Sequence, residues 1–168
     1  MSAVPDVLPL VPSLVGGQAR AGAGTLPITN PATGAVIARV GVADAAVVDA
    51  AVVAARAALP GWSATPPAVR ARHLMKLREL LERDKPRLAE LIVREHGKPT
   101  ADALGSIQRG IEVVEFACAA PQLLKGEHSD AVAPGVATRS SRRPVGVCAG
   151  ITPFNYPAMI PLWMFPMA

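Results

Sequence analysis

The segment most suited to chemistry is Gly150-Ile151-Thr152-Pro153-Phe154-Asn155-Tyr156-Pro157, which follows a short apolar run. Asn155 lies between two prolines, and a stiff loop of this kind can hold its side-chain amide in one direction. An amide N–H held in this way can donate a hydrogen bond to an oxyanion that develops during a reaction. The alternative is that Asn155 only caps a helix or a turn. Both interpretations stay open on the pattern alone.

Nucleophile and metal candidates elsewhere in the sequence are weaker. Cys118 lies on an apolar helical stripe with no base or positive charge nearby, so we interpret it as a core residue. The histidines His73, His96 and His128 are too far apart in sequence to form a metal motif. Gly22-Ala23-Gly24 is no dinucleotide fingerprint, because no strand precedes it and no helix follows it.

The composition indicates a folded chain without a nucleic-acid partner. Hydrophobic residues make up 51% of the 168 residues, which is far too many for a disordered chain. The net charge is +4, and Arg139, Arg142 and Arg143 form the main basic cluster. A surface that stacks nucleic-acid bases needs aromatic residues among the basic ones, and only 4% of this chain is aromatic.

Neither end of the chain is expected to enter a membrane. Residues 1–14 contain no Lys or Arg, and three prolines interrupt their apolar run. This is not the pattern of a signal peptide. Residues 151–168 are apolar, but four prolines interrupt the continuous helix that a membrane span requires. The two cysteines suggest a reducing compartment.

The elements that must position these residues begin with a hairpin and a helix. Asn30-Pro31-Ala32-Thr33-Gly34 is a turn between the strand-like residues 26–29 and 35–40, which predicts the hairpin. Asp44 is placed to cap a helix that runs to about Leu59. We expect Pro60-Gly61 to end that helix.

Leucines at helical spacing predict a further helical segment over residues 65–96. Pro86 is expected to divide it into two helices, since a proline inside a helix costs ~3 kcal/mol. Gly97-Lys98-Pro99 is typical of a helix end. The next helix is expected to start at Thr100 or Asp102, and its buried stripe is Ile107, Ile111, Val114 and Cys118.

The last third of the chain leads to the Asn155 loop. Residues 137–143 are polar and favour an extended strand that is exposed or lies between subunits. Residues 145–151 form a continuous apolar run, which predicts a strand buried on both faces of a parallel sheet. Ligands bind at the carboxyl ends of such strands. Because no second parallel strand follows, we expect the chain to stop within a nucleotide-binding unit.

Three motifs together resemble a known family. They are NPATG at 30–34, EHGKPTADALGSIQRGIEVVEFAC at 95–118, and GVCAGITPFNYPAMIPLWMFPMA at 146–168. The chain from about residue 14 onward is similar to the front third of an aldehyde dehydrogenase. More narrowly, it resembles the CoA-acylating branch, the methylmalonate-semialdehyde dehydrogenases.

The resemblance implies an α/β protein. Residues 1–168 would be a partial NAD-binding domain with a hairpin, helices, an exposed oligomerisation-type strand near 137–143 and the first strand of the nucleotide-binding sheet. The catalytic domain would be absent. The implied activity is the NAD-dependent oxidation of malonate or methylmalonate semialdehyde, a reaction of valine catabolism, with CoA as co-substrate and acetyl-CoA or propionyl-CoA as product. A cytoplasmic homo-oligomer is expected, with no membrane partner.

The resemblance also implies roles for individual residues. Asn155 matches the asparagine of the oxyanion hole, and Thr152 and Phe154 match loop positions that touch NAD. Arg109 matches an arginine that holds the substrate carboxylate, and a guanidinium fork suits that role. The alternative for Arg109 is a solvated arginine on a helix.

The main departure from the family is the missing nucleophile. In the family the sequence continues after this point, and the nucleophilic cysteine follows much later. Cys148 cannot replace it, because Cys148 lies inside the predicted buried strand. We therefore expect a truncated chain that is inactive alone. The alternatives are a non-catalytic fragment that associates with a full-length subunit, and a general NAD-dependent aldehyde dehydrogenase.

Overall fold

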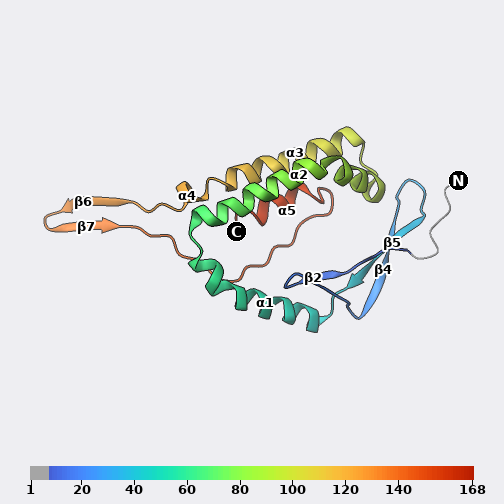
Figure 1. Ribbon diagram of the computed structural model, residues 1–168, viewed down its shortest axis with the longest axis horizontal. Coiled ribbons are helices and arrows are strands. Elements are labelled where there is room, and N and C mark those ends of the chain that lie inside the picture. The colour runs from blue at the N-terminus through green and yellow to red at the C-terminus, as the bar shows by residue number, and fades with distance from the viewer. Residues whose placement is uncertain (1–7) are drawn as a thin grey trace. The chain divides into compact units, whose positions relative to one another are not determined.

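The computed structural model describes residues 8–168 (Figure 1). Residues 1–7, which belong to the segment where no signal peptide is expected, lie outside the described residues. The described residues form two compact units: a first unit of residues 8–60 with 86–105, and a second unit of residues 61–85 with 106–168. The expected mixture of helices and strands is confirmed. Its elements are β1 (Leu10–Val11), β2 (Ser13–Val15), β3 (Gln18–Arg20), β4 (Gly24–Thr29), β5 (Val36–Val42), α1 (Ala45–Ala64), α2 (Pro67–His96), α3 (Thr100–Ala117), α4 (Ala120–Leu123), β6 (His128–Ala133), β7 (Val136–Arg139) and α5 (Met159–Met164).

The predicted hairpin is present in the first unit. Strands β4 and β5 are antiparallel, and β1 pairs with β5 in parallel, so the sheet order is β1-β5-β4. Within the turn, Asn30 Oδ1 accepts a hydrogen bond from the backbone N–H of Ala32 at 2.9 Å. Gly34 has a φ of 71°, a left-handed conformation that glycine adopts without strain.

Helix α1 begins as predicted and ends later than predicted. The carboxylate of Asp44 accepts a hydrogen bond from the backbone N–H of Val47 at 2.9 Å, so Asp44 is the N-cap. The expected end at Pro60-Gly61 is wrong, because the helix continues to Ala64. Pro60 is exposed, so water can reach the carbonyl group that its missing N–H leaves unbonded.

Among residues 8–168, α1 is also the one helix long and apolar enough, by length and composition, to cross a membrane. Its mean hydropathy is 1.3, and none of it is buried. Helices that pack against other protein segments meet the same criteria, so the finding is weak evidence for a span.

Helix α2 is continuous through Pro86, and the predicted division into two helices is wrong. Pro86 itself is exposed. Buried residues lie on both sides of it, with Ala71 before the proline and Ala89 and Ile92 after it. Full burial of one isoleucine contributes about 1.5–3 kcal/mol, so packing of this face offsets the ~3 kcal/mol cost of the proline. Gly97 then ends the helix with a φ of 78°, as predicted.

Three residues of the stripe predicted for α3 lie in the core, whereas the fourth, Cys118, follows the end of α3 and is only half-buried. Ile107, Ile111 and Val114 have no exposed surface, and Ala117 is also buried. Within the second unit, the guanidinium of Arg78 in α2 lies 2.8 Å from a carboxylate oxygen of Glu115 in α3. The pair joins the two helices near this stripe, and the hydrogen bond to Glu115 raises the pKa of Arg78.

The segment after α4 forms a second hairpin, which the sequence predicted only in part. Strand β7 ends at Arg139, so the extended strand predicted over 137–143 is shorter than expected. Strand β6 lies within residues 126–135, where no strand was predicted. Every residue of both strands is exposed. Figure 1 draws the two strands as orange arrows. The prediction of an exposed strand is therefore confirmed.

The buried strand predicted at residues 145–151 is wrong. These residues form neither helix nor strand, and Val145 and Ile151 are 92% and 97% exposed. The physical reason is that a strand is stabilised by backbone hydrogen bonds to a neighbour, and no segment among residues 8–168 pairs with this one. The helix expected after the loop is present as α5.

Candidate active site

A close contact between helices α3 and α5 in the second unit frames the candidate site. Gly110 of α3 is buried, and a Cβ added there would meet Leu162 Cδ1 at 2.8 Å and Met159 Cα at 3.4 Å. Trp163 of α5 donates a hydrogen bond from Nε1 to the backbone carbonyl oxygen of Arg109 at 3.2 Å. Because Gly110 has no side chain, the backbone of α5 can approach α3 beside Arg109.

Three of the predicted site residues lie together in the loop that leads into α5. Phe154 is 89% exposed, Asn155 is exposed, and Thr152 is half-buried. The start of this loop packs on α5, since a Cβ added at Gly150 would collide with the terminal methyl group of Met164. The three residues belong to no helix or strand, so their polar groups lie outside any regular hydrogen-bond ladder.

The fourth predicted residue, Arg109, lies on the helix that α5 contacts. Its side chain is exposed, whereas its helix neighbours Ile107 and Ile111 are completely buried. Among the described residues, no carboxylate forms an ion pair with Arg109. A guanidinium group without an acidic partner can receive a carboxylate through two parallel hydrogen bonds. The structure thus places Arg109 and the Asn155 loop on two elements in contact within one unit.

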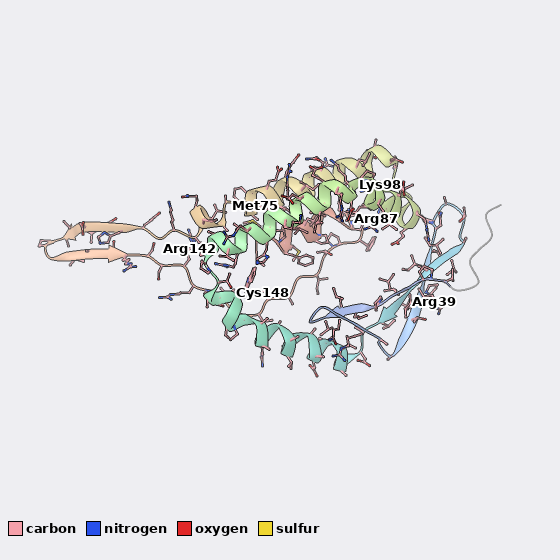
Figure 2. The ribbon with its side chains drawn as sticks, viewed as in Figure 1. Arg39, Met75, Arg87, Lys98, Arg142 and Cys148 are labelled. Carbon is pink, nitrogen blue, oxygen red and sulfur yellow. The ribbon has the colours of Figure 1, made fainter. Side chains whose placement is uncertain are left out.

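The two cysteines are poor candidates for a nucleophile. Cys118 is half-buried, and its burial, with a smaller effect from the charge of Glu115, raises the pKa of the thiol. A raised pKa keeps the thiol protonated near neutral pH, whereas the thiolate is the reactive form. Cys148, labelled in Figure 2, is exposed in the irregular segment before α5, which corrects its predicted position in a buried strand.

We expect iodoacetamide to alkylate Cys148 several times faster than Cys118 at pH 7.5. The reason is that Cys148 is exposed, while burial both shields Cys118 and lowers its thiolate fraction. Peptide mass spectrometry at short reaction times measures the two rates. Denatured protein is the control, in which the two rates should converge. A faster reaction at Cys118 in the folded chain would contradict this prediction.

Two cavities in the second unit contain none of the predicted site residues. One, of about 290 Å³, has Trp62 and Arg70 among its lining residues, and the guanidinium carbon of Arg70 lies 5.9 Å from the centroid of the Trp62 ring. The other, of about 670 Å³, is lined by Arg139, Arg142 and Arg143; Figure 2 labels Arg142. Among residues 8–168, no three His, Cys, Asp or Glu side chains come together as metal ligands.

The sequence analysis did not predict that Trp163 and Gly110 form the contact between α5 and α3. The sequence shows a glycine inside a helix at position 110, and such a glycine often marks a close approach. Nothing in the sequence indicates which element approaches, because Trp163 lies 54 residues away from Arg109 along the chain.

Comparison with known proteins assigns the chain to a protein family. The sequence profile described as the aldehyde dehydrogenase family matches residues 18–168. The chain belongs to this family, which confirms the resemblance.

Individual relatives narrow the likeness within the family. The chain is 52% identical to a malonate-semialdehyde dehydrogenase of Pseudomonas aeruginosa over 84% of its own length and 28% of that protein. It is 45% identical to an acylating, mitochondrial methylmalonate-semialdehyde dehydrogenase of Arabidopsis thaliana over 99% of its length and 28% of the relative. A crystal structure of a Sinorhizobium meliloti protein complexed with NAD superimposes with a TM-score of 0.90 and 45% identity, over 96% of this chain and 33% of that one. The chain thus spans about a third or less of the length of these relatives.

Proposed function

We propose that this chain is part of an NAD-dependent enzyme that oxidises malonate or methylmalonate semialdehyde and transfers the acyl group to CoA, releasing CO2. The proposal rests on Arg109 beside α5, which forms no ion pair with a carboxylate among residues 8–168, since a carboxylate distinguishes these aldehydes from simple ones. The names of the relatives from Pseudomonas aeruginosa and Arabidopsis thaliana support the same substrate class. The word acylating in the name of the second supports CoA as acceptor.

In the proposed reaction, Arg109 binds the substrate carboxylate and Asn155 donates a hydrogen bond to the oxyanion of the tetrahedral intermediate. Such donors act because charge develops on the oxygen mainly in the transition state. Thr152 and Phe154, half-buried and exposed on the same loop, can contact the nicotinamide ribose of NAD. When bound, NAD supplies a hydride acceptor, and this chain contributes only to its binding and orientation.

Two observations bear on the assembly and its location. The fully exposed β6–β7 hairpin offers a surface for association, so we propose a homo-oligomer of the longer protein. Both cysteines are free, which fits a reducing compartment and the proposed cytoplasmic location. The same hairpin favours the second candidate function, a non-catalytic fragment that associates with a full-length subunit.

The 168 residues alone are expected to have no dehydrogenase activity. The proposed reaction needs a thiolate nucleophile. Burial and the charge of Glu115 outweigh the opposing effect of Arg78 and raise the pKa of Cys118. The thiol of Cys148 contacts the carbonyl oxygen of Gly146 at 3.8 Å. The measurement is NADH absorbance with methylmalonate semialdehyde, NAD and CoA. Turnover above a control without protein would refute this expectation, and substitution of each cysteine would then identify the nucleophile.

The proposed function itself is tested with a full-length protein that contains this chain. We expect NADH and acyl-CoA to form together from malonate or methylmalonate semialdehyde. Absorbance measures the NADH, and mass spectrometry measures the acyl-CoA. Formation of a free carboxylic acid without acyl-CoA, from many aldehydes alike, would favour a general aldehyde dehydrogenase instead.

A further inference from the structure

The contact at Gly110 fixes how closely α5 lies on α3. A Cβ at this position would meet Leu162 Cδ1 at 2.8 Å, Leu162 Cβ at 3.2 Å and Met159 Cα at 3.4 Å. The first of these atoms ends a flexible side chain, but the other two belong to the stem and backbone of α5. A larger residue at position 110 would therefore have to move α5 by a few tenths of an ångström.

A hydrogen bond fixes the same contact in a second direction. Trp163 Nε1 donates to the carbonyl oxygen of Arg109 at 3.2 Å, so α5 is attached to α3 next to the guanidinium-bearing residue. Met159, at the start of α5, is 6% exposed. Packing at Gly110 and Met159, together with the bond from Trp163, therefore restricts both sliding and rotation of α5.

The Asn155 loop is attached to α5 at both of its ends. Gly150, at its start, packs against the methyl group of Met164. At its end, the carbonyl of Tyr156 accepts a hydrogen bond from the N–H of Ile160 at 3.3 Å. A displacement of α5 relative to α3 would therefore carry Asn155 with it, while Arg109 stays on α3.

From these observations we propose that the α3–α5 contact sets the spacing between Arg109 and Asn155. This spacing selects aldehydes with one carbon between the carbonyl and the carboxylate. This inference rests on the proposed function and adds to that function the contact that limits the length of the substrate. Gly110 and Trp163 are positioning residues in it. Malonate semialdehyde has the selected length, whereas succinate semialdehyde is longer by one C–C bond of about 1.5 Å.

The expected selectivity follows from geometry. A substrate held at both ends can place its carbonyl carbon correctly only if its length matches the distance between the two binding groups. One additional methylene changes kcat/KM by about 10–200-fold in known enzymes, and a displacement of about 1 Å in a site can cost about 100-fold. An α5 displaced from α3 should therefore accept the longer aldehyde relatively better.

The test compares variants of the full-length enzyme on three aldehydes: malonate semialdehyde, succinate semialdehyde and propanal. Gly110→Ala is the main variant, and Gly105→Ala is the matched control, because a Cβ at Gly105 of the same helix would meet no atom within 4 Å. We expect Gly110→Ala to lower the preference for malonate over succinate semialdehyde, expressed as the ratio of kcat/KM values, by about two- to fivefold, because a shift of a few tenths of an ångström is a fraction of the ~1 Å that costs about 100-fold. Gly105→Ala should leave this ratio unchanged.

Trp163→Phe provides a second variant, which keeps an aromatic ring and removes the hydrogen-bond donor to Arg109. It should change the ratio in the same direction, and it keeps the test decisive if Gly110→Ala fails to fold. Equal losses of kcat/KM on all three aldehydes, in the variants that fold, would refute the proposed length selection and leave the proposed function unaffected. Absence of malonate semialdehyde turnover by the unaltered enzyme would refute both the proposed function and the proposed length selection.

Discussion

Replacement of Asn155 by alanine in the full-length enzyme is expected to lower kcat by about 10²–10³-fold. The hydrogen bond to the oxyanion is made mainly in the transition state, so its loss slows the chemical step. The affinity for NAD should change little, because the amide contacts the reacting oxygen and not the cofactor. Steady-state kinetics with malonate semialdehyde and a separate titration with NAD measure the two quantities.

The chain provides a matched control for this substitution in Asn30, its other asparagine. The side chain of Asn30 accepts a hydrogen bond from Ala32 in the hairpin turn, so Asn30→Ala should lower stability and leave kcat unchanged. The oxyanion role of Asn155 would be refuted by an unchanged kcat in Asn155→Ala. A parallel loss of NAD affinity and melting temperature would instead indicate that Asn155 supports the loop structure.

Replacement of Arg109 by leucine is expected to raise the KM for methylmalonate semialdehyde by about 10–100-fold. Hydrogen bonds to a charged group contribute about 1.5–3 kcal/mol, and each 1.4 kcal/mol corresponds to a factor of ten. Propanal has no carboxylate, so its kinetic constants should change little. Steady-state kinetics on both aldehydes is the measurement.

The contrast between the two aldehydes separates binding from stability. A destabilised enzyme would lose activity on both aldehydes to the same extent. Arg83→Leu is the control variant, because Arg83 is exposed on α2 and pairs with its neighbour Asp84. Equal losses on both aldehydes for Arg109→Leu would mean that Arg109 is a solvated helix arginine, and the general aldehyde dehydrogenase would then be the better proposal.

Short-range chemistry in the sequence predicted the ends and turns of several elements. Asp44 caps α1, Asn30 and Gly34 shape the first turn, and Gly97 ends α2, all as expected. Each of these features depends on bonds within a few residues, so the residue types alone determine it. The core stripe of α3 was predicted for a similar reason, since helical spacing alone places its apolar residues on one face.

The same reasoning was wrong wherever distant segments decide the outcome. Pro86 does not divide α2, because burial of the residues around it offsets the local cost of the proline. Residues 145–151 form no strand, because a strand needs hydrogen bonds from a neighbour, and apolar character cannot supply them.

The residues of the candidate site remain predictions from the sequence: the Asn155 loop was predicted from its prolines and from the resemblance to the family, and Arg109 from the resemblance. The contact of α5 with α3 beside Arg109, through Gly110 and Trp163, is found in the folded chain and not in the sequence pattern. The physical reason is that helix contacts depend on the shapes of two surfaces far apart in the chain. A glycine and a tryptophan 53 positions apart, from 110 to 163, carry no local sign that they share one contact.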